Sequence, residues 1–415
     1  MDVLRRAEPR AGGEHPVPPE HPPPHARVAA LLRGVWPDLR VALLPWAVAR
    51  VLVAAAYVVA IVVADELTPG DRPYHLQQGL FAWDGTFYRD ITTAGYGGLE
   101  EEALRFFPLV PLLARLVAVP LFGARELALV LVSNIGALVA GVLLVRLARR
   151  ETGDDRLAER AAWLVALLPP ALVLVLGYAE SVLMALAIGA FLALRRGRWW
   201  TAALLGVAAG LCRPVGVALV LPAAVEAARG LRGVSLREGA ARVAAVLAPV
   251  AGLASYLAWV GAEYGDWRLP MRLQETEELR GGYANPVARA WDSFVGLFGD
   301  ERFGDGLHAP WILLYLALVL VLLWRWPVSY GLYAGAMVVV ALAAEDIGSF
   351  ERYGLSAFPL LLALATVVRR GRMEAVVLAA TATAWSPPRR GTPSPRRSNR
   401  GPTWCGRCCS TPGTR

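Results

Sequence analysis

The sequence predicts an all-α polytopic membrane protein, and three observations support this class. Hydrophobic residues make up 56% of the 415 residues, and the mean hydropathy is +0.45. Several apolar runs approach the ~20 residues that a helix needs to span a bilayer. The chain contains no lysine, so arginine alone marks the cytoplasmic loops. We expect one bundle of about nine to eleven membrane helices in the cell membrane.

The net charge of +8 is concentrated in one part of the chain. Seven arginines and no acid follow Ala384, so the remainder is nearly neutral. A nucleic-acid-binding domain instead gathers its basic residues on a folded surface. We therefore expect no nucleic-acid partner.

The first 40 residues include a run rich in proline and histidine, from Pro16 to His25. This composition cannot bury a core, so we predict that residues 1–40 are disordered. No apolar segment follows the first charges, so this start does not read as a signal peptide. The first span runs from about Val41 to Ala64, and the arginines before it place the N-terminus in the cytoplasm.

Residues 65–122 form the first external loop, which we expect to carry the active site. Arginine is scarce in residues 65–105, whereas acids and aromatic residues are abundant. The following segment, Phe106 to Phe122, is apolar but contains three prolines and an arginine. It predicts an interfacial helix rather than a further span.

The next three spans alternate in direction: Glu126 to Leu147, Ala161 to Tyr178, and Ser181 to Leu194. Pro169 and Pro170 should kink the second of them, because proline removes a helical donor and clashes with the preceding turn. The tight turn before Ser181 puts Glu180 on the outer side, where we also expect Asp84.

Trp199 to Ala228 is apolar, and arginines flank both of its ends. Both ends should therefore lie in the cytoplasm. Two half-length helices that meet at Arg213-Pro214 satisfy this requirement. An arginine at mid-membrane depth costs about 2.5–3.5 kcal/mol on insertion scales, so Arg213 needs an anionic partner. That partner is either a ligand phosphate or an acid of the protein.

The later segments continue the alternation: an outward span from Ala241 to Val260, an external loop at 262–310, spans from Trp311 to Trp324 and from Val328 to Ala344, an external turn from Glu345 to Tyr353, and a last span from Gly354 to Val368. Met373 to Ala384 begins like another span but stops after about a dozen apolar residues, too few to cross a bilayer. We interpret residues 41–384 as one transmembrane catalytic domain. Residues 385–415 are rich in proline and arginine, and we predict that they form a disordered or frame-shifted tail.

Few metal or nucleophile motifs accompany these segments. The tail has one C-x-x-C pair, Cys405 and Cys408, but a single pair without a second is a weak zinc signal. There is no G-x-x-x-x-G-K-[ST] loop and no H-E-x-x-H. Carboxylate chemistry remains, and a divalent cation shared by Asp84 and another acid is an open alternative.

The polar residues of the external segments recur as ordered motifs. The first loop contains Trp83-Asp84 with Tyr88, Gly95-Tyr96, Glu100, and Phe106-Phe107-Pro108-x-x-Pro111. Later segments add Tyr178-Ala179-Glu180-Ser181, Arg213-Pro214-x-Gly216, and Arg352-Tyr353 with Phe358-Pro359. In these motifs the sequence resembles the PIG-V-like mannosyltransferases of bacterial type, which are GT-C membrane glycosyltransferases related to GPI mannosyltransferase II. The similarity covers roughly residues 41–370.

This resemblance implies a polyprenyl-phosphate-linked sugar, commonly mannose, as donor and a glycan, lipid or protein acceptor outside the membrane. Asp84 would be the general base of an inverting displacement. Arg213 and Arg352 would bind the donor phosphate. The residues that would bind or orient substrate are Trp83, Tyr88, Tyr96, Glu100, Glu180 and Tyr353.

Simpler roles stay open for these side chains. Asp84 could cap a loop or pair with Arg89, and Glu100 could be a solvated surface acid. The aromatic residues could be interfacial anchors, where tryptophan and tyrosine are common. A transporter or flippase of a lipid-linked intermediate, or a non-catalytic GT-C-like membrane protein, is the alternative function. Transporters usually repeat their broken helices, and this sequence shows one such pair, which favours the enzyme.

Overall fold

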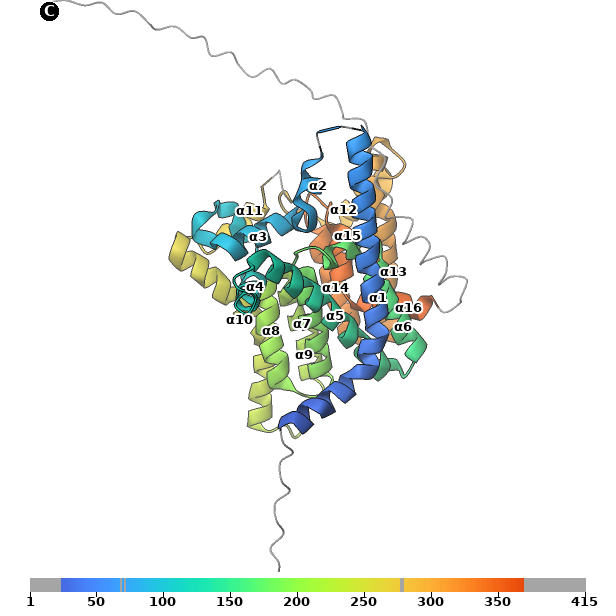
Figure 1. Cartoon of the computed structure of the whole chain (residues 1–415). Coiled ribbons are helices and arrows are strands. Elements are labelled where there is room, and N and C mark those ends of the chain that lie inside the picture. The colour runs from blue at the N-terminus through green and yellow to red at the C-terminus, as the bar shows by residue number, and fades with distance from the viewer. Residues whose placement is uncertain (1–23, 68, 71, 277–279, 369–415) are drawn as a thin grey trace, which may run out of the picture.

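The computed structural model describes residues 24–67, 69–70, 72–276 and 280–368 (Figure 1). Within these ranges the chain is built of helices and contains no strand; one isolated antiparallel bridge joins Tyr283 to Ala344. The predicted all-α class is therefore confirmed.

Four helices in the described part of the chain are long and apolar enough to cross a membrane. They are α1 (Pro24–Leu67), in which the candidate span is Arg33–Leu67, α5 (Arg125–Thr152), α10 (Leu236–Tyr264) and α13 (Ala309–Arg325), whose candidate span begins at Asp305 in the turn before it. Shorter apolar helices pack among them: α4 (Leu109–Ala118), α7 (Glu180–Leu194), α8 (Trp199–Cys212), α14 (Val328–Leu342) and the helical segment Pro214–Ala227, which ends in α9 (Val220–Ala227). This composition is that of a membrane protein.

The remaining helices connect or cover the bundle. They are α2 (Tyr74–Gln78), α3 (Asp84–Ala94), α6 (Asp155–Leu167), α11 (Leu269–Gln274), α12 (Pro286–Gly296), α15 (Phe350–Ser356) and α16 (Pro359–Val367). Short 3-10 turns link them: η1 (Gly79–Phe81), η2 (Tyr96–Gly98), η3 (Glu101–Arg105), η4 (Pro169–Leu174), η5 (Pro214–Leu219), η6 (Asp300–Phe303) and η7 (Asp305–His308). In Figure 1, α2, α3, α11, α12 and α15 lie toward the same end of the bundle. These helices come from the three segments that the sequence predicts to be external.

The N-terminal region differs from the expectation, because α1 begins at Pro24 and residues 24–40 are helical. Alanine, leucine and arginine, which are good helix formers, dominate the sequence after Pro24. A proline fits the first helical position because its missing N–H would have no partner there. The rest of the expected tail, 1–23, lies outside the described residues, as do Met373 to Ala384 and the tail 385–415 with its cysteines.

Two proline-dependent breaks agree with the sequence. Helix α6 ends at Leu167, before the Pro169-Pro170 pair that opens η4. Helix α8 ends at Cys212, Arg213 is extended with φ −157°, and Pro214 opens η5. The expected broken pair at Arg213-Pro214 is therefore confirmed, and Arg213 lies at the junction of its two halves.

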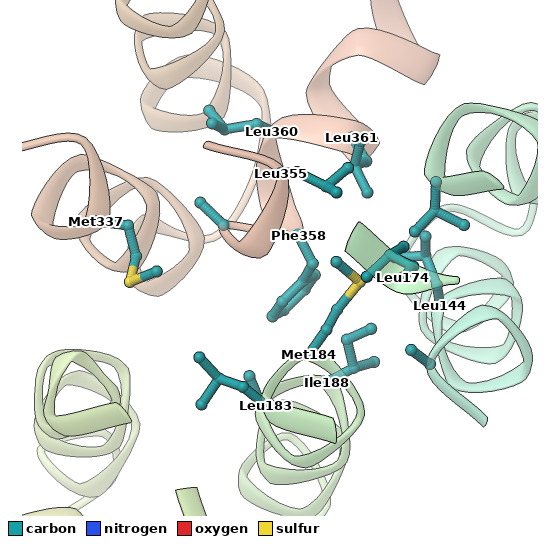
Figure 2. Close-up of a cluster of buried hydrophobic side chains, with 14 of the residues drawn as sticks. Leu144, Leu174, Leu183, Met184, Ile188, Met337, Leu355, Phe358, Leu360 and Leu361 are labelled. Atoms are coloured by element: carbon teal, nitrogen blue, oxygen red, sulfur yellow. The ribbon is translucent and has the colours of Figure 1, made fainter. Parts of the chain in front are cut away.

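The core lies where α5, α7, α14, α15 and α16 meet. Figure 2 shows Phe358 pointing toward Met184 of α7, with leucines of the neighbouring helices around them. Phe358 also makes an edge contact with Phe191, at 5.0 Å between ring centroids. Both rings are almost fully buried. The short α7 is thus surrounded by protein, which allows it to carry polar side chains at its N-terminal end.

Small residues allow α8 and α10 to approach very closely. A Cβ atom added to Gly210 would lie 2.2 Å from the carbonyl oxygen of Pro249, and one added to Gly252 would lie 2.1 Å from that of Val207. Such contacts are too short for any side chain, so glycine is required on both helices. Small residues at a membrane helix interface permit this close backbone packing.

We predict that Gly252→Ala destabilises the protein by about 1–3 kcal/mol, because the added methyl group forces α8 and α10 apart. Gly239→Ala is the control: it lies on the same helix, and its Cβ would meet nothing within 4 Å. Thermal unfolding in detergent measures both variants. The close-packing argument is wrong if the two variants melt at the same temperature.

Candidate active site

Asp84 is the first residue of α3, and a strained residue precedes it. Trp83 has φ +53°, a conformation that a bulky residue rarely adopts. The hydroxyl of Tyr178 stabilises this junction: it donates to the carbonyl of Ala82 at 3.0 Å and accepts from the N–H of Asp84 at 3.1 Å. Strained backbone that is fixed from outside is frequent at functional sites.

Asp84 takes part in a continuous chain of alternating charges. Its Oδ2 accepts a hydrogen bond from Nη1 of Arg352 at 2.5 Å. Nε of Arg352 lies 3.3 Å from Oε1 of Glu180, which also forms an ion pair with Arg213. We call these four residues the charge chain. It joins α3, α15, α7 and the break before η5, and Asp84 and Arg352 are 268 positions apart in sequence.

Burial changes along the charge chain. The side chain of Glu180 is 0% exposed, whereas that of Asp84 is 30% exposed. Oδ1 of Asp84 has no hydrogen-bond partner among the described residues. The buried end is therefore closed by protein, and the Asp84 end has a free carboxylate oxygen that a substrate can reach.

Tyr353 and Arg280 extend the charge chain on the other side. Nη1 of Arg280 donates to the Tyr353 hydroxyl at 3.1 Å, and its guanidinium lies 4.9 Å from the centre of that ring. The guanidinium of Arg213 lies 5.5 Å from the same centre. Burial alone raises the pKa of the Tyr353 phenol, but the three neighbouring arginines, Arg213, Arg280 and Arg352, outweigh burial and lower that pKa below its ordinary value.

The charges of this cluster do not cancel. Two carboxylates, from Asp84 and Glu180, face three guanidinium groups, from Arg213, Arg280 and Arg352. One positive charge is left over. Such a surplus in a partly enclosed site attracts an anion.

The structure brings together Asp84, Glu180, Arg213, Arg352 and Tyr353, which the sequence singled out separately. The partner of Arg213 is an acid of the protein, Glu180. The alternative ion pair of Asp84 with Arg89 does not form, because Arg89 instead bonds Asp90 at 2.9 Å.

The other predicted residues lie beside the charge chain or away from it. Trp83 is exposed and stacks on His75, with 5.1 Å between ring centroids. Tyr88 is buried edge-on against Phe106, whose carbonyl accepts a hydrogen bond from Tyr96 at 2.6 Å. Glu100 is exposed, as a solvated surface acid would be.

Sequence reasoning missed three members of this site. Tyr178 was recognised only as part of a motif, although its hydroxyl fixes the Asp84 junction. Ser349 accepts from Nη2 of Arg352 at 3.1 Å. Arg280 stands in an acid-rich loop with four other arginines, and the one local sign was the Gly281-Gly282 turn that follows it.

A shared divalent cation finds little support in the residues around Asp84. The two acids of the charge chain are both engaged by arginine. Across the described ranges, no group of three or more His, Cys, Asp or Glu side chains is placed to hold a metal ion.

We predict that Glu180→Ala destabilises the protein by roughly 3–5 kcal/mol, because it leaves buried guanidinium groups without their counter-charge. The control is Glu238→Ala, which breaks a half-exposed pair with Arg242 and should cost about 1 kcal/mol or less. Melting temperatures in detergent compare the two variants. Equal losses would contradict a structural dependence on the buried pair.

The solved structures to which this chain is similar include three of an oligosaccharyltransferase from Archaeoglobus fulgidus. The first, tethered with an acceptor peptide, has a TM-score of 0.37 and 14% identity over 80% of this chain and 54% of the other. The second, in complex with Zn and sulfate, has a TM-score of 0.39 and 17% identity over 79% and 51%. The third, in complex with an inhibitory peptide and a dolichol-phosphate, has a TM-score of 0.36 and 12% identity over 80% and 54%. The present chain spans about half the length of these proteins.

A search of curated proteins found no match to this chain. The family model described as Mannosyltransferase (PIG-V) does match, over residues 71–226. This range includes Trp83, Asp84, Tyr178, Glu180 and Arg213, and thus most of the charge chain. Over this range the chain is similar to the mannosyltransferases of the PIG-V family.

Proposed function

We propose that the protein is a GT-C-type glycosyltransferase that moves a sugar, mannose, from a polyprenyl-phosphate donor to an acceptor on the extracytoplasmic side. The observation that carries this proposal is the contact of Asp84 with Arg352 inside a site whose net charge is positive. A base and a phosphate-binding cation lie next to each other there. Inverting sugar transfer from a phosphate needs this pair of groups.

Asp84 is the base in this proposal. The acceptor hydroxyl oxygen bonds to the anomeric carbon of the donor sugar while the bond from that carbon to the phosphate oxygen breaks. The hydroxyl proton passes to Oδ1 of Asp84, and the electron pair of the broken bond leaves with the polyprenyl phosphate. General-base catalysis of this kind contributes typically ~10²–10⁴-fold.

The arginines stabilise the leaving group. Negative charge grows on the phosphate as its bond to the sugar breaks, and fixed cations favour that change. All three arginines are partly accessible: the side chains of Arg352 and Arg213 are 18% and 13% exposed, and Arg280 is half-buried. A phosphate that bonds Arg352 competes with Asp84 for this guanidinium. Donor binding would thus release the carboxylate that the acceptor needs, which couples the two substrates.

Other side chains take supporting roles. Glu180 orients both Arg213 and Arg352 from its buried position. Trp83 offers an exposed indole beside the base on which a sugar ring can stack. Tyr88, Tyr96 and Glu100 would orient the substrate from around the charge chain, to which none of them hydrogen-bonds in the described structure.

We predict that Asp84→Asn lowers transfer of radiolabelled mannose from polyprenyl-phosphate-mannose in membranes by ~10²–10⁴-fold. Asp90→Asn is the matched control, because Asp90 lies on the same helix and its carboxylate, among the described residues, bonds the neighbouring Arg89 and no other side chain. It should retain nearly full activity. Full activity of Asp84→Asn would reject Asp84 as the general base. If the wild type transfers no sugar from any polyprenyl-phosphate donor, the proposed glycosyltransferase activity is rejected and the transporter alternative is favoured.

Arg280→Gln should raise the KM for the donor roughly 10- to 100-fold, the equivalent of one hydrogen bond to a charged group. Arg272→Gln is the control in the same external loop; Arg272 pairs with Asp266 and is mostly exposed. Initial rates at varied donor concentration measure both. An unchanged donor KM in Arg280→Gln would remove this residue from the phosphate site.

A further inference from the structure

A cavity lies at the opposite end of α3 from Asp84. It has a volume of about 250 Å³, and its lining residues come from the end of α3, from α4 with the residues just before it, and from the end of α10. No member of the charge chain lines it. Ile91 and Gly95, which do, follow Asp84 by seven and eleven positions. At 1.5 Å per helical residue, the cavity is therefore about 10–17 Å from the base.

Aromatic rings form one wall of this cavity. Trp259 is 40% exposed and lies 5.2 Å from Tyr96 and 5.9 Å from Tyr264, measured between ring centroids. The wall is fixed from behind, because Tyr96 donates to the carbonyl of Phe106 and Tyr256 donates to that of Leu104. The Trp259 indole, packed against Tyr96, Tyr256 and Tyr264, offers a flat apolar face with few rotatable bonds, so a ligand that packs on it costs little conformational entropy.

Hydrogen-bonding groups complete the lining. Arg115 uses Nε and Nη2 on the carbonyls of Thr92 and Ile91. Its Nη1 and the carboxylate of Glu263 have no partner among the residues that the structure describes. The cavity therefore combines apolar ring faces with one free donor and one free acceptor.

We propose that this cavity binds a sugar ring of the acceptor, a site additional to the reaction centre. A pyranose presents C–H faces that pack on aromatic rings and hydroxyl groups that bond to guanidinium and carboxylate. The volume is just below the range for drug-sized ligands, which suits one ring. An isoprenoid chain fits less well, because it would cover Arg115 and Glu263 without satisfying them.

The assignment of this cavity to the acceptor rests on the proposed function. An acceptor that occupies both places must extend from the cavity along α3 to Asp84. A saccharide of more than one unit, or a glycolipid, has that reach, whereas a free monosaccharide does not. The cavity would thus select acceptors by a ring remote from the reacting hydroxyl.

Two variants test the cavity. Trp259→Ala removes the stacking face, and Gly97→Phe fills the space, since a Cβ on Gly97 would meet nothing within 4 Å. Each has a control. Gly98→Phe is the adjacent substitution, equally open but outside the lining, and Trp291→Ala removes an exposed tryptophan of α12.

The measurement is mannobiose binding to the protein in lipid nanodiscs, by saturation-transfer NMR. We expect wild type and Asp84→Asn to bind alike, Trp259→Ala and Gly97→Phe to bind at least tenfold more weakly, and both controls to bind normally. Three results would overturn the sugar site: all variants bind mannobiose equally, the wild type does not bind it, or polyprenyl phosphate alone displaces it.

Transfer assays separate this inference from the proposed function. In one outcome the wild type transfers sugar while Trp259→Ala and Gly97→Phe leave the acceptor KM unchanged. That result rejects the acceptor site and leaves the proposed glycosyltransferase activity standing. If mannobiose binds at this cavity but no sugar is transferred, the proposed enzyme activity is rejected and the sugar-binding site is supported. An acceptor KM raised tenfold, with the donor KM unchanged, supports both.

Discussion

The ion pair of Glu180 with Arg213 is the constraint on which this structure depends. A charged side chain in the apolar part of a bundle is costly unless a partner of opposite charge meets it there. The break after α8 brings Arg213 to that depth, and the tight turn before α7 brings Glu180 to it. Arg352 of α15 then approaches the same carboxylate. Three distant segments are thus held at one point by the need to neutralise one another.

The same constraint positions Asp84. Arg352 is oriented by Glu180 and Ser349, and it bonds Asp84 from one side. The Tyr178 hydroxyl holds the N–H of Asp84 from the other side. Arg352 and the backbone of Asp84 are thus held in place before any substrate binds, and electrostatic groups that are positioned in advance are effective in catalysis.

Much of this arrangement can be predicted from the sequence. The rest cannot, and the reasons are physical. Pro214 and the flanking arginines fix the break, and the position of Arg213 requires an anionic partner. Which acid serves depends on helix packing, because Glu180 and Asp84 are both predicted at the same end. Arg280 lies in an irregular loop, where no period indicates which way a side chain points. The helix at 24–40 was missed because its proline-rich neighbour dominated the composition.

A purely structural role explains this cluster less well than a functional one. Buried ion pairs contribute little net stability, and well-packed apolar residues often replace them without loss. A structural network would also bury both ends, whereas here Glu180 is enclosed and Asp84 is partly exposed with one free oxygen. The strained backbone of Trp83, the residue directly before Asp84, adds a further cost. Buried charge, surplus positive charge and strain meet at the accessible end of the chain, which is where a phosphate and a hydroxyl would have to bind.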